Sequence, residues 1–89
     1  MVKVAFSSSF KRAFKKKIKG KKDLEERFFK KLEEFINNPF SPGLRTHKLS
    51  GKLKDLWSFS IDYDLRVIFF FEGKDRAVFV SIGTHDEVY

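Results

Sequence analysis

The chain contains no cysteine among its 89 residues. Disulfide bonds and thiolate metal sites are therefore excluded, and the composition suits a reducing compartment such as the cytoplasm. Long apolar runs are also missing, because the longest strong one, Val67 to Phe71, falls far short of the roughly 20 residues that a membrane helix needs. No signal peptide is expected, since the alternating residues Met1 to Phe6 give way to serines and lysines. We expect one domain, because so short a chain has too little volume for two cores.

Acidic residues are missing from the N-terminal part of the chain. Residues 1–22 hold nine Lys or Arg and no acid, whereas residues 23–89 hold ten bases and twelve acids. Such one-sided charge attracts polyanions, so nucleic acid, a ribosome or an acidic protein is the predicted partner. The alternative is a solvated helix face, which is less favoured because acids would then be interspersed among the bases. The concentrated bases are Lys11, Arg12, Lys15, Lys16, Lys17, Lys19, Lys21 and Lys22.

The N-terminal half predicts one strand and two helices. Residues 2–6 alternate like a half-buried strand, and the serines at 7–9 can cap a helix whose apolar stripe runs from Phe10 to Ile18. Gly20 ends that helix. A second amphipathic helix is expected from about Asp23 to Asn37 or Asn38, where a segment rich in asparagine and proline stops it.

The C-terminal half changes to a strand pattern. Residues 56–63, 65–72 and 76–82 predict an antiparallel meander of three strands. In the first of these, Trp57, Phe59 and Ile61 would face the helices, while Ser58 and Ser60 would look outward. The predicted fold class is α+β, with an N-terminal strand and a helical hairpin packed on one side of a small antiparallel sheet.

A few polar residues stand out as candidates for chemistry. Arg66 interrupts the most apolar strand, so it either pairs with Asp62, Asp64 or Glu87 or binds a phosphate, and the pattern leaves these readings equal. His47 lies in a basic loop ahead of the sheet. His85 lies in the ending Gly83 to Tyr89, whose side chains would project from the sheet rim.

The motifs that commonly mark other site types are missing. No metal-ligand spacing, nucleophilic serine motif or phosphate-binding glycine loop is present, so neither a metal nor a cofactor is expected. A set of His, Arg, Asp and Tyr on a basic scaffold suits metal-free cleavage of RNA. In that reaction the ribose 2′-hydroxyl attacks the neighbouring phosphate with acid–base help.

Three motifs carry a resemblance over essentially the whole chain: His47-x-Leu49-x-Gly51, Asp64-Leu65-Arg66-Val67-Ile68-Phe69 and Gly83-Thr84-His85-Asp86-Glu87-Val88-Tyr89. Together with the lysine-rich hairpin, they resemble the RelE/ParE superfamily of type II toxin–antitoxin toxins and are most similar to its YafQ-like branch. The resemblance implies a microbial ribonuclease-type fold and a cytoplasmic endoribonuclease that cleaves mRNA in the ribosomal A site. A cognate antitoxin would silence it.

The resemblance also implies site residues. His47, Asp64 and His85 match acid–base residues, Arg66 matches a phosphate-binding arginine, and Tyr89 matches an aromatic that positions the nucleotide. Arg45 and Lys48, with the basic residues of the hairpin, would contact RNA or the ribosome. The sequence departs from the YafQ-like pattern at Ser60, where a further histidine is expected. Ser60 is no substitute as a proton donor, so either activity is lower or His47 and His85 divide the work.

Two other readings belong to the same superfamily. A ParE-like member would inhibit DNA gyrase and would not cleave RNA, but gyrase binding gives no reason for His85, Arg66 and Tyr89 to occur together. A degenerate, inactive toxin that only binds an antitoxin is the second alternative, which the missing histidine permits.

Overall fold

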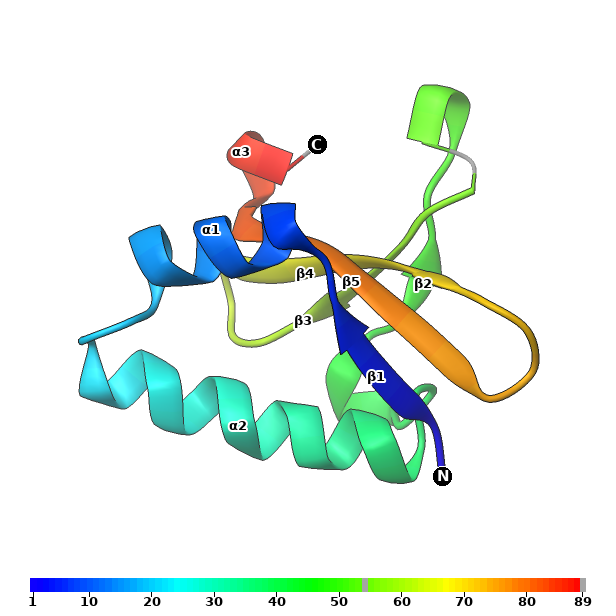
Figure 1. The fold of residues 1–89 in the computed structure, drawn as a ribbon, viewed down its shortest axis with the longest axis horizontal. Helices are drawn as coiled ribbons and strands as arrows, with labels where there is room; N and C mark the ends of the chain where they lie inside the picture. Colours follow the sequence, from blue (N-terminus) through cyan, green and yellow to red (C-terminus); the bar gives the residue numbers. More distant parts are fainter. Residues whose placement is uncertain (54, 89) are drawn as a thin grey trace.

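The computed structural model describes residues 1–53 and 55–88. A five-stranded sheet carries two long helices, and a short helix follows its last strand (Figure 1). The elements in chain order are β1 (Lys3–Phe6), α1 (Ser8–Lys17), α2 (Lys22–Asn37), the 3-10 turn η1 (Pro42–Leu44), β2 (His47–Lys48), the 3-10 turn η2 (Gly51–Leu53), β3 (Trp57–Ser60), β4 (Leu65–Phe71), β5 (Arg76–Thr84) and α3 (His85–Val88).

The sheet has the strand order β1-β5-β4-β3-β2. Strands β3, β4 and β5 form the expected antiparallel meander, and β1 adds to β5 in parallel. A parallel partner requires a long connection, and here the whole segment from α1 to β4 lies between β1 and β5. The two-residue strand β2 and the one-turn helix α3 were not predicted, because both are shorter than a periodic pattern needs to be recognised. The predicted α+β class is confirmed.

Both long helices begin and end where local signals place them. Ser7 caps α1, because its hydroxyl accepts a hydrogen bond from the Phe10 backbone N–H at 3.1 Å. Gly20 has a φ of +85°, a left-handed conformation that favours glycine and turns the chain into α2. At the other end of α2, Asn38 is extended and precedes Pro39.

Phe35 of α2 lies at the centre of the core. Its ring centroid is 4.8 Å from that of Phe59 on β3, 5.0 Å from Phe69 on β4 and 5.3 Å from Phe79 on β5. Phe10 of α1 also contacts Phe79, at 5.5 Å. Because Phe79 touches both helices, α1 and α2 pack on the same face of the sheet, as expected for the helical hairpin.

The opposite face of the sheet is less open than the sequence predicts. Ser58 is fully buried and Ser60 is only 9% exposed, so the prediction that both serines look outward is wrong. Ser58 lies between His47 on β2 and Ile68 on β4 in the strand register, and larger neighbours shield the small hydroxyl side chains. The sequence could not reveal this, because β2 was not expected as a neighbouring strand.

The central position of Phe35 generates a stability prediction. Phe35→Ala should lower the free energy of unfolding by about 3–5 kcal/mol, since it leaves a cavity among three strands. Phe29, which is 56% exposed on the same helix, provides the control. Phe29→Ala should cost less than about 1.5 kcal/mol. Urea denaturation of both variants measures the difference, and similar losses would contradict a core centred on Phe35.

Candidate functional site

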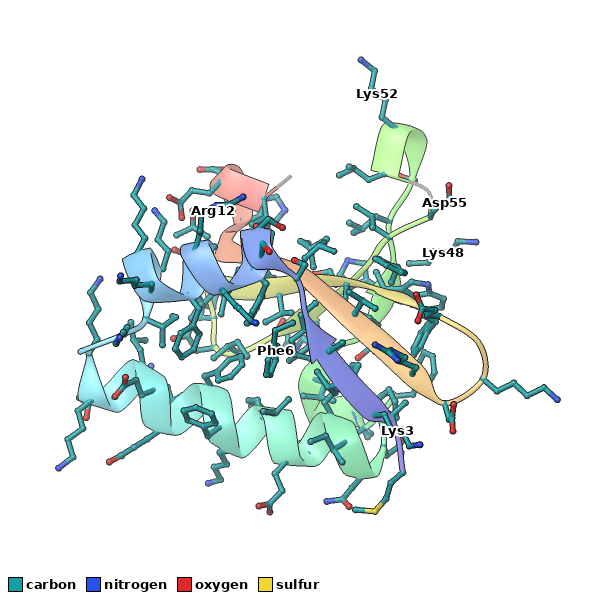
Figure 2. The ribbon with its side chains drawn as sticks, viewed as in Figure 1. Lys3, Phe6, Arg12, Lys48, Lys52 and Asp55 are labelled. Carbon is teal, nitrogen blue, oxygen red and sulfur yellow. The ribbon has the colours of Figure 1, made fainter. Side chains whose placement is uncertain are left out.

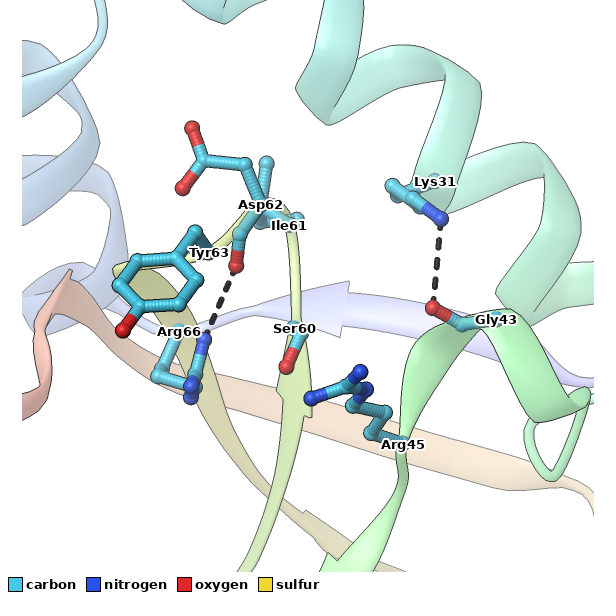
Figure 3. Close-up of a pocket in the computed structure, with 8 residues that line it drawn as sticks. All are labelled: Lys31, Gly43, Arg45, Ser60, Ile61, Asp62, Tyr63 and Arg66. Carbon is cyan, nitrogen blue, oxygen red and sulfur yellow. Dashed lines mark hydrogen bonds between the residues drawn. The ribbon is translucent and has the colours of Figure 1, made fainter.

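A cavity of about 300 Å³ opens where η1, α2 and the β3–β4 turn meet (Figure 3). Three cationic side chains line it, together with hydroxyl groups and a carboxylate. The lining residues are Lys31, Gly43, Arg45, Ser60, Ile61, Asp62, Tyr63 and Arg66. Such a concave, cation-rich surface suits an anionic ligand.

Arg66 is held in this cavity without an acidic partner. Its Nη1 donates a hydrogen bond to the backbone carbonyl of Asp62 at 2.9 Å. Among the described residues it forms no ion pair, because the candidate carboxylates are engaged elsewhere or lie apart: Asp62 pairs with Arg27 at 3.0 Å, and Glu87 pairs with Lys17. The ion-pair reading of Arg66 is therefore not realised, and the remaining guanidinium donors are available to a ligand.

The Asp62 carboxylate shapes the β3–β4 turn. Burial alone would raise its pKa, but hydrogen bonds from the backbone N–H groups of Leu65 and Asp64, together with Arg27, outweigh burial and lower it. The carboxylate therefore stays ionised near neutral pH and fixes the turn from which Arg66 emerges.

Arg45 has an unusual backbone for its residue type. Its φ of 53° lies in the left-handed region, where a residue with a side chain is uncommon. Figure 3 shows its guanidinium beside the Ser60 hydroxyl, with Arg66 on the other side of Ser60. In the part of the chain that the structure describes, the Arg45 side chain has no hydrogen bond or ion pair. Residues with such uncommon backbone conformations are concentrated at functional sites.

Lys31 contributes less free charge to the cavity than the two arginines do. Its Nζ donates to the Gly43 carbonyl at 3.3 Å and lies 3.7 Å from a carboxylate oxygen of Glu34. Lys31 therefore helps to hold η1 against α2, while Arg45 and Arg66 provide the uncommitted donors.

His47 is fixed in one tautomer by its own loop. Its Nδ1 lies 2.9 Å from the backbone carbonyl of Arg45. Because a carbonyl oxygen can only accept a hydrogen bond, Nδ1 of the neutral ring carries the hydrogen and Nε2 has the free lone pair. His47 can therefore accept a proton at Nε2.

His85 is the first residue of α3, directly after β5. Its Nδ1 lies 3.8 Å from a carboxylate oxygen of Asp86, and 59% of its side chain is exposed. Arg66 pairs with Gly83 in the register of β4 and β5, two residues before His85. The imidazole therefore belongs to the same end of the sheet as the Arg66 guanidinium.

The strand register shows how far apart the predicted site residues lie. From Arg66, one strand spacing of about 4.8 Å leads to β5, which continues into His85, and two such spacings lead to β2. His47 on β2 pairs with Ser58, which pairs with Ile68, so His47 also lies two residues along the sheet from Arg66. Leu65 pairs with Thr84, so the next position along this register would bring Asp64 opposite His85. Within the described residues, however, no hydrogen bond links the exposed Asp64 carboxylate to either histidine. The assignment of Asp64 stays a prediction, and Tyr89 lies outside the described residues.

The predicted basic residues lie on α1, on the turn after it and at the start of α2. Seven of the eight are exposed, and Lys17 is the half-buried exception, since it pairs with Glu87. Figure 2 shows Arg12 extending from α1 near α3, Lys48 on the edge strand β2 and Lys52 on η2, which projects beyond the sheet. Positive charge therefore borders the site face from two directions.

An apolar groove of about 450 Å³ lies between α1 and α2. Phenylalanine rings form its floor, and lysines from α1 stand at its rim. Phe6 and Phe29 are 39% and 56% exposed, which is high for large apolar side chains. The groove residues are Phe6, Phe10, Lys11, Phe14, Lys15, Lys19, Glu25, Phe28 and Phe29.

Glu87 is the site residue that the sequence analysis missed. Its Oε1 accepts a hydrogen bond from the Thr84 backbone N–H at 2.9 Å, and its Oε2 pairs with Lys17. These two contacts, the Lys17 bond first, lower the pKa of Glu87 from 4.5 to about 2. The sequence held a signal for this contact, because Thr84-x-x-Glu87 has the spacing of a capping box at a helix start.

In the described part of the chain, residues 1–53 and 55–88, no group of three His, Asp or Glu side chains could hold a metal ion. None of the helices found there has the length and apolar character to span a bilayer.

Several solved structures share this fold. A metal-bound toxin from Helicobacter pylori superposes with a TM-score of 0.78 and 24% identity, covering 100% of both chains. YafQ from Escherichia coli strain BL21(DE3) gives 0.75 and 18%, covering 100% of this chain and 99% of that one. A YoeB–YefM complex from Staphylococcus aureus gives 0.75 and 16%, covering 96% and 98%. No curated protein sequence matches the chain.

The protein thus shares the fold of the RelE-like toxin structures, in which a small sheet carries a helical hairpin. The sequence matches the family described as "Bacterial toxin of type II toxin-antitoxin system, YafQ" over residues 2–89. The chain belongs to this family. It is a toxin of a type II toxin–antitoxin system, and an antitoxin partner follows from that membership.

The Lys17–Glu87 pair generates a pH prediction. A carboxyl whose pKa is lower in the folded than in the unfolded protein stabilises the folded state at every pH above the unfolded pKa of 4.5. This contribution is lost as the pH falls from 4.5 toward 2. In an NMR titration, the Glu87 carboxyl should show a midpoint of about 2. Lys17→Met should raise that midpoint toward 4.5. Lys16→Met removes a neighbouring charge without touching Glu87 and should leave the midpoint unchanged; a shift of similar size would refute the specific contact.

Proposed function

We propose that this toxin is a metal-independent endoribonuclease that cleaves mRNA in the ribosomal A site. The observation that carries the proposal is the pair of guanidinium groups, Arg45 and Arg66, which reach one cavity on either side of Ser60 without a carboxylate partner among the described residues. A phosphate group offers several acceptor oxygens, to which the planar donor fork of each guanidinium can bind in a bidentate manner. The family supports a ribonuclease reading of this geometry.

The proposed reaction uses the RNA as its own nucleophile. The ribose 2′-oxygen attacks the adjacent phosphorus, the bond from phosphorus to the 5′-oxygen breaks, and the products carry a 2′,3′-cyclic phosphate and a 5′-hydroxyl. Negative charge grows on the phosphate oxygens as the phosphorane forms. Arg66 and Arg45 would stabilise that charge, and Ser60 would donate a hydrogen bond without transferring a proton.

Two proton transfers complete this reaction. His47 would remove the 2′-hydroxyl proton, because its free Nε2 is an acceptor. His85, on the other side of Arg66, would protonate the leaving 5′-oxygen. Asp64 would orient His85 from the neighbouring strand end, and Tyr89 would stack a base or aid proton removal. The two histidines would thus carry out both proton transfers, since Ser60 stands where a third histidine is expected.

Binding to the ribosome would depend on the exposed bases rather than on the cavity. The exposed lysines of α1 and of the α1–α2 turn would contact ribosomal RNA phosphates, and Lys48 would do so from the edge strand β2. Association by phosphate contacts weakens steeply with added salt. We propose that the toxin acts in the cytoplasm, on translating ribosomes.

A cleavage assay tests this function. On programmed ribosomes, the wild-type toxin should cut mRNA within A-site codons and leave a 2′,3′-cyclic phosphate. His85→Ala should lower the rate by about 10²–10⁴-fold because it removes a proton transfer. Arg66→Gln should lower it by about 10²–10³-fold because it removes charge from the phosphate. Primer extension locates the cuts, and analysis of the RNA ends identifies the chemistry.

The matched control is Arg76→Gln. Arg76 lies at the start of β5 and pairs with Glu72, away from the cavity, so this variant should cut at the wild-type rate. Cleavage of free RNA in EDTA separates metal dependence from the ribosome's own need for Mg²⁺. A folded wild-type protein that leaves mRNA intact but inhibits supercoiling by gyrase would refute the ribonuclease and establish the ParE-like alternative. Antitoxin binding with neither activity would indicate a degenerate toxin.

We further propose that the antitoxin inserts an acidic amphipathic segment into the groove between α1 and α2. The phenylalanine floor suits an apolar helix face, and the rim residues Lys11, Lys15 and Lys19 suit acidic flanks. Binding there would also cover part of the basic surface proposed for the ribosome. The toxin would then be silenced without occupation of the catalytic cavity.

Substitution of Phe29 tests this binding mode. Phe29→Asp places a charge in the apolar groove and should weaken binding of the co-purified cognate antitoxin by about 30-fold, the loss expected at an interface hot spot. Phe40→Asp is the control, since Phe40 is similarly exposed at 55% but lies outside the groove. Calorimetric titration measures both affinities. If the two variants bind the antitoxin with equal affinity, the antitoxin does not bind in this groove.

A further inference from the structure

The helix that carries His85 is too short to be stable by itself. α3 spans His85–Val88, a single turn at the end of β5. Isolated helices of this length do not form in water, because nucleation costs more than one hydrogen bond returns. Contacts with the rest of the protein must therefore hold the imidazole of His85 in place.

One carboxylate supplies two of these contacts. Glu87 accepts a hydrogen bond from the Thr84 backbone N–H at 2.9 Å, which closes the turn around His85. Its other oxygen pairs with Lys17 Nζ, at the last residue of α1 and 70 positions earlier in the chain. We call this arrangement of Lys17, Glu87 and Thr84 the tail clamp.

Gly83 allows the clamp to close. A Cβ atom at Gly83 would lie 3.1 Å from Glu87 Oε1 and 3.2 Å from Val88 Cγ1, closer than ordinary contacts. Because Gly83 has no side chain, α3 folds back against β5. Gly83 is also the register partner of Arg66, so the clamp closes next to the arginine of the cavity.

Lys17 differs from the other bases of α1. Lys11, Lys15 and Lys16 are exposed, whereas Lys17 is half-buried and forms an ion pair with Glu87 of the tail. Its charge is thus engaged within the protein and is less available to RNA than the charges beside it. The sequence pattern grouped these lysines together, and only the tertiary contact separates them.

We propose that Lys17 and Glu87 are positioning residues that hold His85 beside the phosphate bound by Arg66. This inference rests on the proposed ribonuclease function. Neither side chain touches the RNA; both act by fixing α3, so that the imidazole reaches the leaving oxygen in a productive geometry. Small displacements of a catalytic group lower a rate strongly while leaving substrate binding unchanged. The clamp should therefore affect kcat and not KM.

The test compares single and paired substitutions on programmed ribosomes. Lys17→Met and Glu87→Gln should each lower kcat about 10-fold with KM within about twofold of wild type. The double variant should be no slower than the slower single variant, because both changes break one contact. Lys17→Arg keeps the ion pair and should restore most of the rate. Lys16→Met is the charge-matched control and should alter KM alone.

A second readout does not depend on cleavage. Exchange of the Thr84 amide hydrogen, followed by NMR on the free protein, should be faster in Lys17→Met and in Glu87→Ala than in wild type. Faster exchange together with the kcat loss would support the clamp. A wild type that cuts RNA, with unchanged kcat and exchange in Lys17→Met, would overturn the clamp and leave the ribonuclease intact. A wild type that does not cut would overturn both.

Discussion

The structure depends on the packing of Phe35 against three strands at once. Its ring lies against Phe59, Phe69 and Phe79, so a single side chain of α2 fixes the positions of β3, β4 and β5 relative to the hairpin. Aromatic rings supply much buried area per residue, which a chain of this length needs in order to form a stable core. Both helices therefore occupy one face of the sheet, and the cavity opens where α2 meets η1 and the β3–β4 turn.

The distribution of ion pairs then determines which charges remain available. Asp62 is committed to Arg27 and to the backbone of its own turn, and Glu87 is committed to Lys17. Both carboxylates build the frame of the site and leave the arginines in the cavity uncommitted. A guanidinium without a carboxylate partner in a polar cavity is poised for an anionic ligand. Because Asp62 and Glu87 pair with cations other than the cavity arginines, these acidic residues can lie close to the proposed phosphate site without neutralising the charge of Arg45 and Arg66.

The arrangement also relates the two surfaces of the toxin. The exposed lysines of α1 form part of the surface proposed to bind the ribosome or the antitoxin. Lys17, on the same helix, forms an ion pair with Glu87 in the C-terminal tail. The same helix also forms one side of the apolar groove. Family membership makes the protein a toxin with an antitoxin partner, and this geometry gives a physical basis for the proposal that binding at α1 and chemistry at the sheet end are carried by one small scaffold.

Much of the fold was determined by the sequence alone, because periodicity and capping act locally. The stripe from Phe10 to Ile18, the Ser7 cap and the aromatic strands predicted α1, α2 and the meander correctly. Tertiary structure alone decided the parallel pairing of β1, the burial of Ser58, the partner of Lys17 and, within the described residues, the lack of a carboxylate partner for Arg66. These depend on residues far apart in the chain, whose proximity arises only when the hydrophobic faces pack together, and a local pattern contains no information about which distant charge or strand will become a neighbour.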